Sequence, residues 1–115
     1  MALKATESGK PFRYDTGTDL SSNTALALKF TNPAGTEITV ANPRVTAPAS
    51  NVTVTVDGAS VVFSGNEYME FFTNATDFVT AGTWKVCGIY TNTGASPNPE
   101  IWHGDEVSFT VSEAC

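Results

Sequence analysis

The sequence predicts an all-β protein that folds as a single antiparallel β-sandwich. Its 115 residues match the length of one domain. Charged residues make up only 16% of the chain, against about 25% in an average globular protein. Threonine is frequent, and these two features together favour strands over long solvated helices. Apolar and polar residues also alternate in several short segments with turn residues between them, which is the period of half-buried strands.

Residues 1–22 are predicted to form an extended N-terminal arm, and residues 23–115 are predicted to form the sandwich. The arm is polar and aperiodic, but it carries two aromatic residues, Phe12 and Tyr14. Ordering a segment costs about 1–2 kcal/mol per residue, which an isolated arm cannot offset without a surface to lie on. We therefore expect residues 1–14 to be loosely docked in the isolated chain. They would become ordered against a neighbouring subunit, with Phe12 and Tyr14 as buried anchors.

Two strands are predicted at the start of the sandwich. Apolar and polar residues alternate strictly from residue 23 up to a turn at 32–35, and a second alternating segment covers 36–40. Pro43 then indicates a sheet edge or a bulge, because proline has no N–H to donate to a neighbouring strand. The residues expected to point inward from these two strands are Leu26, Leu28, Phe30, Ile38 and Val40.

A β-hairpin is predicted over residues 52–63. Valine and threonine alternate from Val52 to Val56, and Asp57-Gly58 supplies the positive φ angles that a tight turn requires. A further strand is predicted over 67–73. Bulky residues occur at both parities of this strand, so its inward face is the least defined in the chain.

The clearest strand pattern begins at Trp84, after a polar crossover over 74–83 that contains one or two buried anchors. Trp84, Val86, Gly88 and Tyr90 share one face. The opposite face is also apolar enough for a central strand. Residues 92–104 form the longest predicted loop.

The last predicted strand covers 106–111, with Val107, Phe109 and Val111 pointing inward. Seven or eight short strands with turns between them predict an immunoglobulin-like antiparallel β-sandwich. Its expected core consists of Leu26, Leu28, Phe30, Ile38, Val40, Trp84, Val86, Phe109 and Val111.

The charge balance argues against nucleic acid as a partner. The chain has 12 acidic and 6 basic residues and a net charge of −6, and such a surface repels a polyphosphate backbone. No apolar run approaches the roughly 20 residues that span a bilayer, and the N-terminal segment lacks the apolar core of a secretory signal. We therefore expect no membrane partner and a cytoplasmic place of assembly, where Cys87 and Cys115 are free thiols.

No catalytic, metal-binding or cofactor-binding residues are predicted. Asp15-Thr16-Gly17 spells the tripeptide of aspartic proteases, but the apolar strand that precedes it in such enzymes is absent, and an Asx-type turn is the favoured interpretation. His103 is the only histidine and has no second nitrogen ligand at metal-binding spacing. The acidic residues in turns lack the regular spacing of a calcium loop.

Four aromatic residues are the candidates for contact with a partner. Phe12, Tyr14 and Trp102 lie in the predicted arm and long loop, and Tyr90 lies next to that loop. Large aromatic residues on irregular segments frequently contribute to binding. The alternative is that the arm packs on its own sandwich and Trp102 covers one end of the core.

Three segments and the final strand also resemble a known group of proteins. The segments are 15–22 (DTGTDLSS), 32–36 (NPAGT) and 77–84 (DFVTAGTW), and the chain closes with a Val-x-Phe-x-Val strand. In these features the chain resembles the small immunoglobulin-like virion structural proteins of tailed bacteriophages. This group includes baseplate and tail-fibre adaptor modules and capsid-decoration proteins. The resemblance extends over residues 15–111.

The resemblance implies a non-enzymatic structural protein of a virion, assembled in the host cytoplasm without a cofactor. Its expected partners are other virion proteins, with multiple copies in a symmetric assembly, and its expected place is the tail, baseplate or fibre region. Capsid decoration is an alternative. Another alternative is a carbohydrate-binding module in which Trp102 and Tyr90 stack on a glycan of the host surface.

Overall fold

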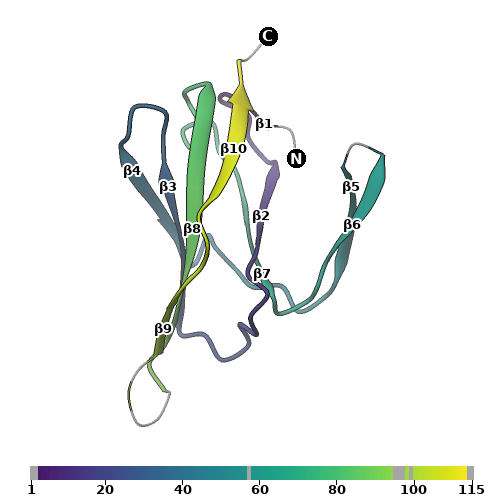
Figure 1. The fold of residues 1–115 in the computed structure, drawn as a ribbon, viewed down its shortest axis with the longest axis vertical. Coiled ribbons are helices and arrows are strands. Elements are labelled where there is room, and N and C mark those ends of the chain that lie inside the picture. The colour runs from purple at the N-terminus through teal and green to yellow at the C-terminus, as the bar shows by residue number, and fades with distance from the viewer. Residues whose placement is uncertain (1–2, 57, 95–97, 99, 114–115) are drawn as a thin grey trace.

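The computed structural model describes residues 3–56, 58–94, 98 and 100–113, and within them the fold is all-β, without helices (Figure 1). The all-β prediction is therefore confirmed. Ten strands lie in the described part of the chain, whereas seven or eight were expected. Asp57 of the predicted hairpin turn and Cys115 lie outside the described residues. The strands are β1 (Leu3–Lys4), β2 (Pro11–Asp15), β3 (Ala25–Thr31), β4 (Glu37–Ala41), β5 (Val52–Val56), β6 (Ala59–Phe63), β7 (Tyr68–Phe72), β8 (Gly82–Asn92), β9 (Glu100–His103) and β10 (Val107–Ser112).

The larger sheet has the order β1-β10-β8-β3-β4, and β9 also pairs with β8. The strand that begins at the crossover, β8, is central, as its two apolar faces predicted. Leu28 lies opposite Gly88 and Phe30 lies opposite Val86, so the buried residues of β3 and β8 share one face. The pair β1–β10 is parallel, and the expectation of a wholly antiparallel arrangement is therefore wrong.

The smaller sheet pairs β2 with β7, which places Phe12 opposite Phe71 and Tyr14 opposite Met69. A bridge between Thr46 and Glu70 extends it on the other side of β7. The expectation that residues 1–14 are loosely docked is thus wrong for the described residues 3–14, because β1 and β2 are strands of the chain's own two sheets. Although the N-terminal segment is polar on average, its five residues from Pro11 to Asp15 alternate as a strand does.

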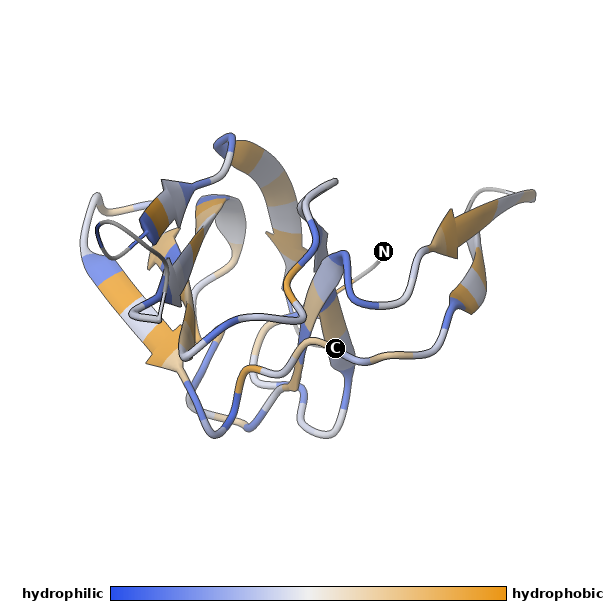
Figure 2. Cartoon of the chain, turned by 90° about the horizontal axis from the view of Figure 1, so that it is seen from below, coloured by the Kyte–Doolittle hydropathy of each residue, from blue (hydrophilic) through white to orange (hydrophobic). Residues whose placement is uncertain are grey.

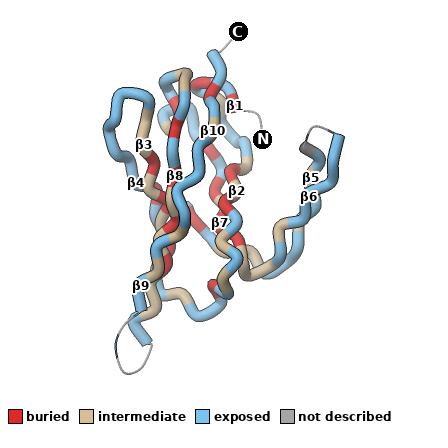
Figure 3. Tube along the Cα trace, viewed as in Figure 1, coloured by how far each residue is buried: buried red, intermediate tan, exposed pale blue. Residues whose placement is uncertain are grey.

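Phenylalanine rings fill the space between the two sheets. The ring of Phe12 lies 5.1 Å from that of Phe30, across the interface, and 5.5 Å from that of Phe71. Phe78 is the buried anchor of the 74–83 crossover and meets Trp84 edge to face at 5.1 Å. Figure 3 shows that the buried residues lie mainly on the strands of these two sheets. Such edge-to-face contacts add to the free energy gained by burying the rings.

Most of the predicted core residues are buried, and two are not. The confirmed residues are Leu26, Leu28, Phe30, Val40, Trp84, Val86 and Val111. Ile38 was expected inside but is 37% exposed. Its register opposite Phe30 is correct, but it lies on the edge strand β4, where only Val40 of the same face is buried, so the facing sheet does not cover the Ile38 end of the strand. Phe109 is only partly buried, at the periphery of the core.

The hairpin β5–β6 stands apart from the two packed sheets (Figure 1). Its two strands pair as predicted, but its expected place within the sandwich is wrong. In Figure 2 the hairpin projects away from the body with apolar colouring on both strands. Its base is fixed near β7: the phenol of Tyr68 donates a hydrogen bond to the Ser50 carbonyl at 3.2 Å, and the Gly65 N–H donates to the Asn51 side chain at 2.7 Å.

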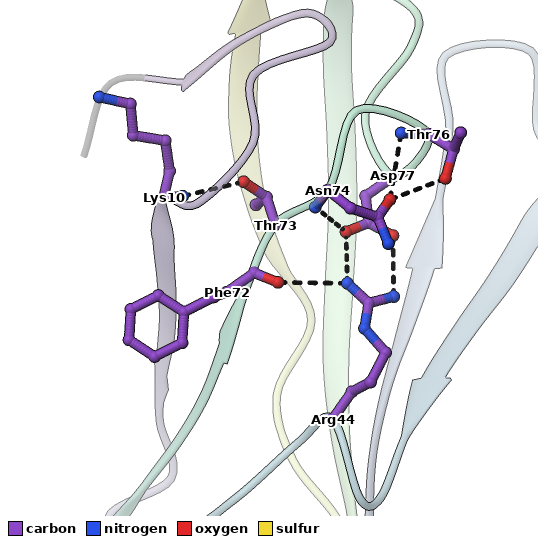
Figure 4. A network of polar contacts seen from close by, with 7 residues as sticks. All are labelled: Lys10, Arg44, Phe72, Thr73, Asn74, Thr76 and Asp77. Carbon is purple, nitrogen blue, oxygen red and sulfur yellow. Dashed lines mark hydrogen bonds and ion pairs between the residues drawn. The ribbon is translucent and has the colours of Figure 1, made fainter.

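A polar cluster fixes the start of the crossover to the segment after β4 (Figure 4). The Arg44 guanidinium donates to both carboxylate oxygens of Asp77, at 3.0 and 2.6 Å, and to the Phe72 carbonyl at 3.2 Å. Burial raises the pKa of Asp77, but hydrogen bonds from Arg44 and from the Asn74 N–H outweigh it and hold that pKa below its ordinary value. The cluster therefore has a structural role, because each of its charges has a partner within it.

Candidate functional site

The two sheets leave one side of the fold open, between β2 and β10. Val107 and Val111 lie on the same face of β10, opposite Val86 and Gly82 of β8. Val111, beside β1, is only 1% exposed, whereas Val107 is 48% exposed. The exposure of this inward-facing valine indicates that the smaller sheet, whose last described strand on this side is β2, does not extend over it.

The outer edge of β2 borders this open side. Hydrogen bonds from the Thr73 N–H to the Lys10 carbonyl and from the Thr16 N–H to the Glu67 carbonyl fix the pairing with β7. In antiparallel pairing, alternate residues direct their backbone groups to the partner strand. Arg13 and Asp15 therefore direct theirs away from β7, and among the described residues no strand pairs with them.

Two adjoining hollows form a groove along this side, which we call the β2–β10 groove. The first is mostly apolar, with a volume of about 230 Å³. The second is more polar, with a volume of about 380 Å³. They share Tyr14, Asp15 and Val107. The residues that line the groove are Phe12, Arg13, Tyr14, Asp15, Thr16, Thr18, Val86, Trp102, His103, Gly104, Asp105, Val107 and Phe109.

A β-bulge shapes the polar end of the groove. Ile89 lies opposite His103 and Val86 lies opposite Val107, so two residues of β8 face three residues, 104–106, between β9 and β10. The phenol of Tyr14 donates a hydrogen bond to the Asp105 carbonyl at 2.5 Å. Burial raises the pKa of this phenol, which keeps it a donor. Gly104 has no room for a side chain, because a Cβ there would clash with the Tyr14 hydroxyl.

The structure brings the four predicted binding residues together beside this groove, although most of them are buried. Tyr90 lies opposite Trp102 in the β8–β9 pair, and β9 occupies part of the predicted loop 92–104. Phe12, Tyr14 and Tyr90 are buried in the chain's own core. The expected role of Phe12 and Tyr14 as anchors in a neighbouring subunit is therefore wrong, and Tyr90, a candidate contact residue, is only 3% exposed. Trp102 is only partly buried and is the one of the four that offers surface to a ligand.

The protruding hairpin is a second candidate surface, which the sequence analysis missed because it placed these strands in the sandwich. Val52 lies opposite Phe63 and Val54 lies opposite Val61, so the two strands share an apolar face. Val62, on the other face, is 55% exposed. The sequence does carry a signal, since Asp57 is the only ionisable residue in 51–66.

The protease-like tripeptide Asp15-Thr16-Gly17 forms a turn at the end of β2. The Asp15 carboxylate accepts a hydrogen bond from the Gly17 N–H at 3.1 Å, which confirms the Asx-type turn at the protease-like tripeptide. No group of three or more His, Cys, Asp or Glu residues that could hold a metal ion occurs in the part of the chain that is described. Within that part there is also no helix long and apolar enough to cross a membrane. Comparison with protein-family models, curated proteins and solved structures finds no match.

Proposed function

We propose that this chain is a non-enzymatic structural subunit of a tailed-phage virion, an immunoglobulin-like module of the tail, baseplate or fibre region. The observation that carries the proposal is the β5–β6 hairpin, which exposes apolar residues outside the core. An isolated two-stranded hairpin is marginally stable in water at best. A subunit that keeps such a hairpin is suited to contact with another protein, as virion subunits are.

The immunoglobulin-like part of the proposal is supported by the strand order. In variable-type immunoglobulin domains the C, F and G strands form one sheet, which the C′ strand extends, and the B and E strands belong to the other. Here β3, β8 and β10 are consecutive neighbours, β4 extends that sheet beyond β3, and β2 pairs with β7 in the second sheet. The β5–β6 hairpin lies between the C′-like and E-like strands in sequence.

Capsid decoration is the alternative within the same class, because it uses the same contact surfaces at a different place in the particle. The carbohydrate-binding alternative has weaker support. Sugar stacking needs the exposed face of an aromatic ring, and of Tyr90 and Trp102 only Trp102 is accessible, and only in part. A tryptophan-fluorescence titration with host-surface glycans should therefore stay flat. A saturable change that Trp102→Ala abolishes would favour the carbohydrate-binding function instead.

The direct test is quantitative mass spectrometry of gradient-purified particles produced from a genome that encodes this chain. We expect the chain in multiple copies per particle, and immunogold labelling should place it at the tail or baseplate. Label on the head would favour capsid decoration. Absence of the chain from purified particles would overturn the proposed function.

A further inference from the structure

We propose that the β5–β6 hairpin of one copy of this chain docks in the β2–β10 groove of a second copy, where β5 pairs with the free edge of β2. This inference rests on the proposed function, since it identifies how such subunits associate. It joins two surfaces of the same molecule that each lack a partner.

The apolar face of the hairpin is not covered by the rest of the described chain. Val54 and Val61 lie opposite each other; Val54 is partly exposed and Val61 is 39% exposed. Its edges also lack the usual protection against strand pairing, because residues 51–56 contain no proline, lysine or other charged residue. A strand of alternating valine and threonine with open backbone groups is suited to pairing with another edge.

The groove has a strand edge, that of β2, which is unpaired within the described chain. The backbone groups of Arg13 and Asp15 point out of the smaller sheet, with no pairing strand among the described residues. An additional strand beside β2 would lie across from β10. Its inward side chains would then cover Val107 and Phe109, the inward-facing residues that the smaller sheet leaves exposed or partly exposed.

The hairpin cannot reach the groove of its own chain. Its strands join the body on the Thr46 side of β7, whereas the free edge lies on the far side of β2. The base is held by the Tyr68–Ser50 hydrogen bond and by a hydrogen bond from the Asn66 N–H to the Pro48 carbonyl at 2.8 Å. The occupant therefore comes from another molecule.

A second copy fits the groove in length, pattern and charge. Strands β2 and β5 are both five residues long. With β5 beside β2, Val52 and Val54 can continue the inner face that Phe12 and Tyr14 form, while Thr53 and Thr55 face solvent. The chain carries a net charge of −6, and Asp15 and Asp105 lie at the groove. The nearly uncharged hairpin can approach this rim without the repulsion that acts between most other surfaces of two copies.

Because the hairpin and the groove are different surfaces, the contact is heterologous. Each copy gives one hairpin and receives another, so association continues from copy to copy until a ring closes or a filament forms. This property allows a test by complementation. A copy with a defective hairpin and a copy with a defective groove should each fail alone, yet form one pair when they are mixed.

The experiment uses the full chain in analytical ultracentrifugation over a range of concentrations. Val54→Lys disables the hairpin face, and Val107→Lys disables the groove. Ser60→Lys and Thr110→Lys are matched controls, because they add the same charge on the exposed outward faces of β6, which does not pair with β2, and of β10. We expect the wild type and both controls to associate, and each disabling variant to weaken association by at least about tenfold. The equimolar mixture of the two disabling variants should form a dimer and no larger species.

Hydrogen exchange provides a second measurement that does not depend on any substitution. In the wild type the backbone amides of Arg13 and Asp15 should gain protection as the concentration rises, because β5 of another copy then accepts their hydrogen bonds. A wild type that stays monomeric at high concentration, without this protection, overturns the inference. Association of Val107→Lys alone, with loss only in Val54→Lys, would mean hairpin-to-hairpin pairing and also overturns it. Either result leaves the proposed function standing if the chain is found in particles.

Discussion

Substitution of Phe12 by alanine tests whether the N-terminal segment belongs to the core. The Phe12 ring is buried and lies 5.1 Å from Phe30, 5.5 Å from Phe71 and 5.2 Å from Phe109. The ring therefore packs against a neighbour in its own sheet and against two strands of the larger sheet. A ring removed from such a position loses the free energy of its burial and leaves a cavity that its neighbours fill only in part.

The expected cost of Phe12→Ala is about 3–5 kcal/mol, the usual range for a buried phenylalanine. A domain of this size has a total stability of about 5–15 kcal/mol, so the variant loses a large share of it. With a denaturant slope of about 1–3 kcal/mol per molar urea, the midpoint of unfolding should fall by about 1 M or more.

The assay is urea unfolding at low protein concentration, followed by tryptophan fluorescence, to which Trp84 contributes from a buried position in contact with Phe78. Phe72→Ala is the matched control, because Phe72 lies opposite Pro11 in the same sheet but is 59% exposed. We expect the control to lose less than about 1 kcal/mol. Equal and small losses for the two variants would refute the placement of β2 in the core.

Three further predictions follow from individual contacts. Asp77→Asn should destabilise the fold by about 1–3 kcal/mol at neutral pH. The folded-state pKa of Asp77 lies below its ordinary value of 3.8, so the wild type should lose this stabilisation as the pH falls below about that value. Asp77→Asn has no carboxylate at this position and should not show this loss. Thermal melts from pH 7 to pH 2 measure the difference. Gly65→Ala should loosen the hairpin base, since a Cβ there would overlap the Ala49 carbonyl, and limited proteolysis should then cut the hairpin faster than in the wild type. Cys87 is a free, partly buried thiol, so a thiol reagent should react with it more slowly in the native chain than after denaturation. If the reagent detects no thiol in the denatured, unreduced chain, the prediction of free cysteines is wrong.

Local alternation was enough to locate most strands and their inward faces. Leu26, Leu28 and Phe30 on β3 and Trp84 and Val86 on β8 are buried as their parity predicts. These strands lie at the centre of the larger sheet, where a neighbour on each side and a facing sheet make parity decide burial. Parity failed for residues at the borders of the sheets, such as Ile38 and Val107, because a pattern within one strand does not reveal how far the opposite sheet extends.

The position of whole segments could not be predicted in the same way. The alternation of Val52 to Val56 predicts a hairpin but not whether another sheet lies beneath it, and the segment proved to stand alone. The average polarity of residues 1–22 conceals the five-residue strand that contains Phe12 and Tyr14. The groove combines β2 with β8, β9 and β10. Only the long-range pairing of these strands brings its residues together.

The parallel pair β1–β10 determines how the fold responds to mechanical load. Leu3 lies opposite Val111 and Lys4 opposite Ser112, and the Ala5 N–H donates to the Ser112 carbonyl at 2.7 Å. Because the two strands run in the same direction, tension applied between the two ends of the chain pulls them along their axes in opposite senses. The hydrogen bonds between them then carry the force together, in shear, and do not open one after another. We therefore expect the sliding of β1 past β10 to be the first event under tension.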